Sequence, residues 1–278
     1  MSDRRVPWAR VAPLALLLVL AGATLLGDTG WLRLPSADGR VANRVEDALD
    51  GMPARPVVLV GFDPDLGTYA EVRPTVRSLL ADLLQRDARI AFVSLTAEGR
   101  ALLLGELDRL ERLDVNPRRV LDLGFIPGAE AALVGLARGP FLASAETALA
   151  NRLRVDGAAA IDGVVVVGGN DLGPRTWVEQ FLPRVDRPLI AIAPTVLLPE
   201  LQPYLGSGQI DALLGTPRDG AAYRLSLDLK NLDRFADDRG PAPIAVLVGL
   251  LAAAVVLLHA LGRRLVGAAR EARGREEA

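Results

Sequence analysis

Short runs of apolar, mostly β-branched residues recur along the middle of this chain, and stretches of helical length separate them. The clearest run is GVVVVG at residues 163–168, which contains no polar side chain. Continuous runs of this kind are typical of strands that are buried on both faces of a sheet. By the same pattern we predict strands at residues 56–62, 89–95, 119–125 and 188–193.

The stretches between these runs favour helices. In residues 72–86 apolar side chains recur three and four positions apart, which places them on one stripe of a helix. We expect Thr96 to begin a second helix that extends to about residue 113, because threonine caps helix N-termini well. Further helices are predicted at residues 128–137, 143–152 and 174–184, with a turn or helix at 199–205. Strands that alternate with helices imply right-handed crossovers, so we predict an α/β fold with a mostly parallel, doubly wound, Rossmann-like sheet.

An uncharged apolar segment, residues 11–27, precedes this α/β region. Its length is just sufficient to cross the hydrocarbon core of a bilayer as a helix, and we interpret it as a transmembrane helix or signal anchor. A cleaved signal peptide is the alternative, because a basic stretch precedes the segment and small residues stand at positions 21–23.

A second apolar segment, residues 241–262, follows the α/β region and ends at Arg263 and Arg264. It has the length of a full transmembrane helix. Arginines are denser in residues 1–10 and 263–278 than beside the inner ends of the two segments, so we expect both termini to be cytoplasmic. Residues 28–240 are then an extracytoplasmic α/β domain with its linkers, and the protein lies in the cell membrane.

The composition excludes several kinds of chemistry. The formal net charge is −2, whereas nucleic-acid binding normally requires a basic surface. The chain has no cysteine, which excludes disulfides, thiol catalysis and thiolate metal sites. The single histidine, His259, lies in the second apolar segment, so a histidine triad or histidine-ligated metal is not expected in the middle domain. We predict no cofactor and no nucleic-acid partner.

One motif favours an enzymatic alternative. Asp63 and Asp65 follow the first predicted strand, and their spacing resembles that of the two catalytic aspartates in haloacid-dehalogenase-type phosphatases. The resemblance implies a Mg²⁺-dependent hydrolase in which Asp63 attacks phosphorus. Ser94, Asn170 and Asp171 stand at strand ends where that family places a hydroxyl and acidic metal ligands.

The chain departs from that family in two respects. Thr68 lies one residue further from the second aspartate than the family pattern requires, and the only lysine, Lys230, lies close to the second apolar segment. Asp-Pro-Asp and Gly-Asn-Asp are also ordinary turn sequences. We therefore keep the hydrolase as the alternative and a turn as the simpler interpretation.

Three longer stretches, in this order, resemble an uncharacterised family of prokaryotic membrane proteins. They are VLDLGFIPGAEAALVG at residues 120–135, RTWVEQFLPR at 175–184 with PLIAIAPTVLLP at 188–199, and QPYLGSGQIDALLGTPRDGAAY at 202–223. The resemblance implies an α/β domain between two terminal transmembrane segments. It supplies no activity.

Ligands of open parallel sheets bind beyond the carboxyl ends of the strands. Our candidate ligand-binding residues combine glycines, which allow close approach of the backbone, with polar side chains: Gly124, Gly128, Glu130, Asn170, Asp171, Thr195, Ser207, Gly208 and Gln209. The alternative is that they serve as helix caps and tight turns. We also expect the loops at residues 125–130 and 204–209 to point the same way.

The leading hypothesis is a membrane-anchored binding or assembly module and not an enzyme. We expect it to belong to a membrane protein complex, through contacts with other membrane proteins or through self-association of the second span. Ala245, Gly249 and Ala253 form a small-residue face on that span, where another helix could pack closely.

Overall fold

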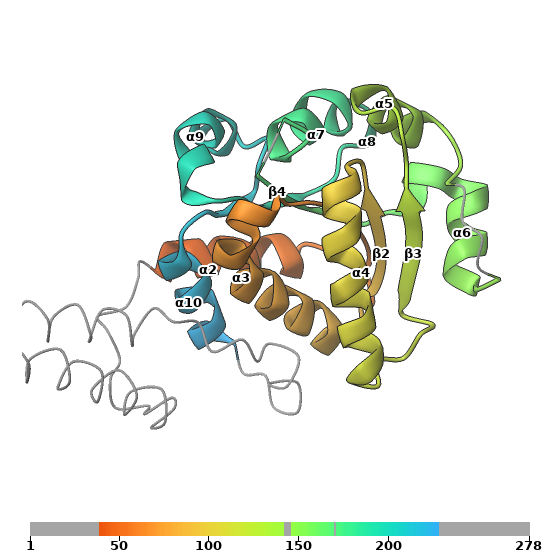
Figure 1. The fold of residues 1–278 in the computed structure, drawn as a ribbon, viewed down its shortest axis with the longest axis horizontal. Coiled ribbons are helices and arrows are strands. Elements are labelled where there is room, and N and C mark those ends of the chain that lie inside the picture. Colours follow the sequence, from red (N-terminus) through yellow and green to blue (C-terminus); the bar gives the residue numbers. More distant parts are fainter. Residues whose placement is uncertain (1–38, 142–145, 170, 228–278) are drawn as a thin grey trace, which may run out of the picture. The chain divides into compact units, whose positions relative to one another are not determined.

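In the part of the chain that the structure describes, six parallel strands form one sheet in the order β3-β2-β1-β4-β5-β6 (Figure 1). The structure is a computed structural model, and it describes residues 39–141, 146–169 and 171–227. The strands are β1 (Val57–Asp63), β2 (Arg89–Ser94), β3 (Val120–Phe125), β4 (Gly163–Gly168), β5 (Leu189–Ile192) and β6 (Ala212–Leu214). The predicted α/β class with a parallel, Rossmann-like sheet is confirmed.

β1 lies in the middle of this sheet, between β2 and β4. Val60 is aligned with Phe92 of β2 on one side and with Val165 of β4 on the other. Every residue of β1 and of β4 is buried. Burial on both faces explains why these two strands are continuous apolar runs with no alternation of polar residues.

Helices cover both faces of the sheet. One layer contains α2 (Gly39–Asp50), α3 (Leu66–Gln85), α4 (Ala97–Arg112) and α10 (Pro217–Ser226). The other contains α5 (Glu130–Arg138), α6 (Ala148–Asp156), α7 (Pro174–Gln180), α8 (Leu182–Val185) and α9 (Leu198–Gly206), with the short 3-10 helices η1 (Gly157–Ala160) and η2 (Thr195–Leu197). Each layer shares a hydrophobic core with one face of the sheet.

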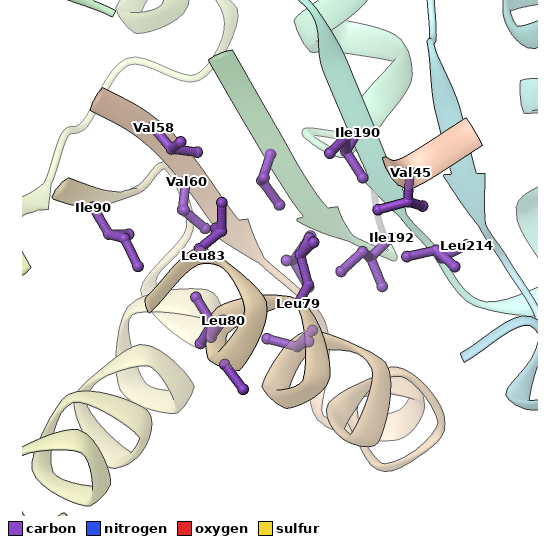
Figure 2. Close-up of a cluster of buried hydrophobic side chains, with 14 of the residues drawn as sticks. Val45, Val58, Val60, Leu79, Leu80, Leu83, Ile90, Ile190, Ile192 and Leu214 are labelled. Carbon is purple, nitrogen blue, oxygen red and sulfur yellow. The ribbon is translucent and has the colours of Figure 1, made fainter. Parts of the chain in front are cut away.

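Alternation along β1 divides its side chains between the two cores. Val58 and Val60 face the core under α3, whereas Val57 and Leu59 belong to the core on the opposite face. Figure 2 shows the first core, where Leu79 and other leucines of α3 lie against the strands. Truncation of one such leucine to alanine typically costs about 2–5 kcal/mol of stability, so α3 is a principal support of the sheet.

The sequence prediction missed or misplaced several elements. Helices α2 and α10 and strand β6 were not predicted, and α6 ends at Asp156, beyond the predicted end at residue 152. Helix α3 begins at Leu66 and not at residue 72, because Asp65 caps its first turn and the helix continues through Pro74. α10 has a clear start signal in the sequence, a capping box between Thr216 and Asp219.

The predicted transmembrane helices at residues 11–27 and 241–262 lie outside the described residues, as do residues 1–10, residues 263–278 and Asn170. Among the helices that are described, none combines the length and the apolar character needed to cross a bilayer.

Candidate functional site

The winding of the sheet reverses between β1 and β4, and this reversal marks the place where open α/β sheets most often bind ligands. Asp63 ends β1 and is aligned with Gly168, which ends β4. The N-termini of α3 and α4 follow directly after β1 and β2. We call the polar residues gathered here the switch-point cluster: Asp63, Asp65, Thr68, Thr96, Glu98 and the backbone of Gly169.

Asp63 holds the end of β1 to the connection between β2 and α4. Its side chain is completely buried. Its Oδ1 accepts hydrogen bonds from the backbone N–H groups of Leu95 (2.7 Å) and Thr96 (2.8 Å), and from the Thr96 hydroxyl (2.9 Å). Burial raises the pKa of Asp63 to about 6, against the opposing effect of these hydrogen bonds. The carboxyl group therefore has a structural role, bridging two neighbouring strand ends.

Two further carboxylates occupy the N-terminus of α3. Asp65 is the N-cap residue: its Oδ1 accepts from the Thr68 N–H (2.9 Å) and its Oδ2 from the Thr68 hydroxyl (2.6 Å). The N–H of Leu66 donates to Glu98 Oε1 at 2.5 Å. In dinucleotide-binding folds the free N–H groups at this helix end bind the pyrophosphate. Here acidic side chains already bind two of them, and their negative charge opposes a phosphate at the same place.

The cluster is also closely packed. A Cβ atom on Gly169 would lie 2.3 Å from Asp65 Oδ2 and 2.7 Å from Thr68 Oγ1, so only glycine allows this approach of the loop after β4. The loop therefore lies directly on the N-cap of α3. At the switch point the described part of this loop and the N-terminus of α3 are therefore in direct contact.

The aspartates predicted for the hydrolase alternative do not assemble a metal centre in the described part of the chain. There, no group of three or more histidine, cysteine, aspartate or glutamate side chains is placed to hold a metal ion. Asp171 is exposed, and the Ser94 hydroxyl donates to the backbone oxygen of Phe62 at 2.9 Å. Asp63 is buried, and the three donors that bind it all contact its Oδ1.

Thr195 lies at the same edge of the sheet, after β5. Its N–H donates to Glu71 Oε1 of α3 at 2.9 Å, and its hydroxyl lies within hydrogen-bond distance of that oxygen and, at 3.0 Å, of the Gly215 carbonyl. These bonds tie the connection after β5 to α3 and to the end of β6. Like the side chain of Asp63, the N–H and hydroxyl of Thr195 are bound by other residues of the domain.

Gly124 lies within the outer strand β3, and Gly128 and Glu130 follow it. β3 contains a bulge opposite Phe92 and Ser94, and Gly124 adopts φ +85° there while its N–H donates to Asp122 Oδ1 at 2.9 Å. Gly128 has φ +118°, and Glu130 is the exposed first residue of α5. The two glycines therefore adopt backbone conformations that other residues rarely adopt.

Ser207, Gly208 and Gln209 form the turn that ends α9. Gly208 has φ +76°, and the Gln209 N–H donates to the Tyr204 carbonyl at 2.9 Å, a usual way to close a helix C-terminus. This turn precedes β6, so it lies at the amino-terminal edge of the sheet. Residues 125–130 follow β3 and lie at the carboxyl edge, beyond the opposite outer strand. Our expectation that the two loops point the same way is wrong.

Three exposed apolar side chains, which were not predicted from the sequence, lie at the carboxyl edge. Leu66 at the start of α3 is 69% exposed, Phe125 at the end of β3 is 45% exposed, and Val196 after β5 is 73% exposed. They follow three different strands whose carboxyl ends share this edge. We call Leu66, Phe125 and Val196 the apolar rim.

Comparisons with known proteins gave no relative: no protein-family model matches the chain, and neither a curated protein nor a solved structure is significantly similar to it.

Proposed function

We propose that this protein is a membrane-anchored binding or assembly module whose α/β domain contacts other membrane proteins through the carboxyl edge of its sheet. The observation that carries this proposal is that the polar groups of the switch point are hydrogen-bonded to one another. Its carboxylates are bound by the chain's own N–H and hydroxyl groups, while the apolar rim around it is exposed. Burial of these exposed apolar side chains against a partner would be favourable, which supports a contact surface at this edge.

The membrane part of the proposal rests on the sequence. The two apolar segments, residues 11–27 and 241–262, have the length and lack of charge of transmembrane helices. The arginine distribution favours cytoplasmic termini and an extracytoplasmic domain. In addition, α2 and α10, the first and last described helices, pack against each other, so the chain enters and leaves the domain through neighbouring elements.

The topology is tested with reporter fusions. A reporter fused after Arg264 should be active only in the cytoplasm, and one fused after Arg44 only outside it. The opposite pattern would invert the proposed orientation of the domain.

The role of the apolar rim is tested by affinity purification of the full chain at native abundance in mild detergent. We expect Leu66→Ser/Val196→Ser to lose co-purifying membrane proteins that the wild type retains. The matched control is Leu104→Ser/Leu225→Ser, because these leucines are also exposed (49% and 70%) but lie on α4 and α10, away from the carboxyl edge. A wild-type protein recovered alone and monomeric would contradict the proposal, as would equal losses in both variants.

A Mg²⁺-dependent hydrolase that uses Asp63 and Asp65 is the alternative function. It is favoured by the raised pKa of Asp63 at the switch point, since perturbed carboxyl groups concentrate at catalytic sites. Its test is hydrolysis of p-nitrophenyl phosphate with Mg²⁺ by the wild type and by Asp63→Asn. Activity that depends on Mg²⁺ and disappears in the variant would favour the hydrolase over the binding module.

A further inference from the structure

A second feature lies at the amino-terminal edge of the sheet, on the side away from the switch point. A groove of about 450 Å³ opens there between the C-terminal ends of α5, α6 and α8 and the short helix η1. η1 leads into β4 and Arg187 leads into β5, which places the groove beside the amino ends of these two strands. We call it the amino-edge groove.

The lining of this groove is basic. Arg138, Arg184 and Arg187 line it, against the single acidic residue Asp156, an excess of two positive charges. All three arginines are exposed, and within the described residues none of them forms an ion pair, whereas other arginines such as Arg77 and Arg100 do. Arg184 Nη1 donates to the Gln180 carbonyl at 2.7 Å, which fixes one side of its guanidinium.

The walls of the groove are held by backbone contacts. A Cβ on Gly157 would lie 2.5 Å from the Gly139 carbonyl oxygen, so the end of α6 and the segment after α5 are in direct contact. The Phe141 N–H donates to the Leu153 carbonyl at 3.1 Å and fixes the same segment. Val155, which is 82% exposed, adds an apolar surface to this lining.

Helix ends explain only part of this arrangement. Arg138 and Arg184 lie in the last turns of α5 and α8, where a positive charge interacts favourably with the helix dipole. Arg187 lies beyond α8 and has no such role. A guanidinium group presents several N–H donors in a fixed plane, so a favourable position at a helix end leaves donors available to a ligand.

We propose that the amino-edge groove binds a small organic anion through a phosphate or carboxylate group, with Arg138 and Arg187 as the principal charge partners. Guanidinium groups bind both kinds of anion through paired hydrogen bonds. The volume lies in the range of small-molecule sites, about 300–1,000 Å³, and Val155 provides contact for an apolar part of the ligand. The site is separate from the apolar rim, so the domain presents a small-molecule site and a protein-contact surface at opposite edges of one sheet.

The test uses the full-length protein in a neutral detergent, with inorganic pyrophosphate and citrate as probes at constant ionic strength. We expect saturable binding by calorimetry and a higher melting temperature. Arg138→Gln/Arg187→Gln should weaken binding at least about tenfold, the effect of losing one charge-assisted hydrogen bond. Arg44→Gln/Arg118→Gln is the matched control: both arginines are exposed, lie outside the groove and form no ion pair within the described residues. This variant should bind like the wild type.

Two further measurements complete the test. Short-chain phosphatidylglycerol, compared with short-chain phosphatidylcholine, identifies the source of the anion. Binding of phosphatidylglycerol alone, lost in Arg138→Gln/Arg187→Gln, would assign a lipid headgroup. Binding of pyrophosphate or citrate would assign a soluble ligand. Arg138→Lys/Arg187→Lys keeps the charge and should recover part of the affinity while folding normally. The proposal is overturned if no probe binds, or if the control variant loses as much affinity as the groove variant.

Discussion

The Tyr223 hydroxyl donates a hydrogen bond to Asp82 Oδ2 at 2.6 Å, and both side chains are buried where α10 packs against α3. Asp82 Oδ1 also accepts from Arg86 Nε at 3.0 Å, and Arg86 pairs in turn with Asp50 at the end of α2. One polar network therefore connects the first and last described helices through α3. Burial and the neighbouring Asp82 charge raise the pKa of Tyr223 well above its usual value, so the phenol remains a donor.

Removal of this hydrogen bond should destabilise the domain. In Tyr223→Phe, Asp82 loses a donor inside the protein, which we expect to lower the free energy of unfolding by about 1–3 kcal/mol. Urea denaturation measures the change. Tyr204→Phe is the control, because Tyr204 donates to Glu179 at 2.6 Å on the exposed surface and should cost less than about 0.5 kcal/mol. Equal losses in the two variants would show that burial of the Tyr223–Asp82 bond does not matter.

The raised pKa of Asp63 predicts a dependence of stability on pH. Its folded-state value is about 6 against an ordinary value of 3.8, so the folded protein binds the proton more tightly than the unfolded chain. The stabilisation from the protonated group is complete below the unfolded value and is lost as the pH rises through 6. For a shift of this size the loss is on the order of 3 kcal/mol.

Asp63→Asn should abolish this pH dependence, because the amide does not titrate in that range. We expect the wild type to lose stability relative to the variant between about pH 4 and about pH 7. Unfolding free energies measured across this interval provide the comparison. Parallel curves for the two proteins would mean that the pKa of Asp63 is not raised.

The ion pair between Arg77 and Glu106 should be a strong contributor to the packing of α3 against α4. Arg77 Nη2 lies 2.6 Å from Glu106 Oε1 and its Nε 3.0 Å from Oε2, and the carboxylate is only 4% exposed. Glu106→Ala leaves a buried positive charge and should cost about 3–5 kcal/mol. Asp108→Ala, which removes the exposed partner of Arg112 on the same helix, should cost less than about 1 kcal/mol. Chemical denaturation of the two variants measures this difference, and similar costs would contradict the ranking.

The positive φ of Gly208 predicts that this residue is needed for the turn. No atom lies within 4 Å of a Cβ built at Gly208, so the cost of Gly208→Ala comes from the backbone and should reach about 1 kcal/mol. Gly206 has equally open surroundings and no positive φ, so Gly206→Ala should preserve or raise stability. Melting temperatures and co-purification yields of both variants test this prediction. Lost partner binding in Gly208→Ala at unchanged stability would assign the glycine to a binding site.

Most of the sheet could be predicted from local pattern. β4 was placed at its observed residues and β1, β2, β3 and β5 within one residue at each end, because a strand buried on both faces requires an uninterrupted apolar run. β6 has only three residues, which is too short to show the apolar pattern of a strand. α10 packs against α3 through the small Gly220 and the buried Tyr223, and therefore lacks an apolar stripe.

The candidate site was less predictable, because its bonds join distant parts of the chain. Asp63 was singled out by its position after a strand, but its partners Leu95 and Thr96 lie 32 and 33 residues away. Whether the loops near Glu130 and Gln209 meet depends on strand order, which local pattern does not specify. The amino-edge groove depends on the same long-range arrangement of Arg138, Arg184 and Arg187.

The position of β4 beside β1 has a consequence for how the chain is made. β1, β2 and β3 are synthesised before β4. The hydrogen bond from the Val57 N–H to Asp162, directly before β4, joins residues that are 105 positions apart. Until the ribosome has released β4, one side of the apolar β1 remains without a neighbour, and an unpaired strand edge readily joins another chain. Nascent chains that stop between β3 and β4 should therefore be the ones that aggregate or recruit chaperones.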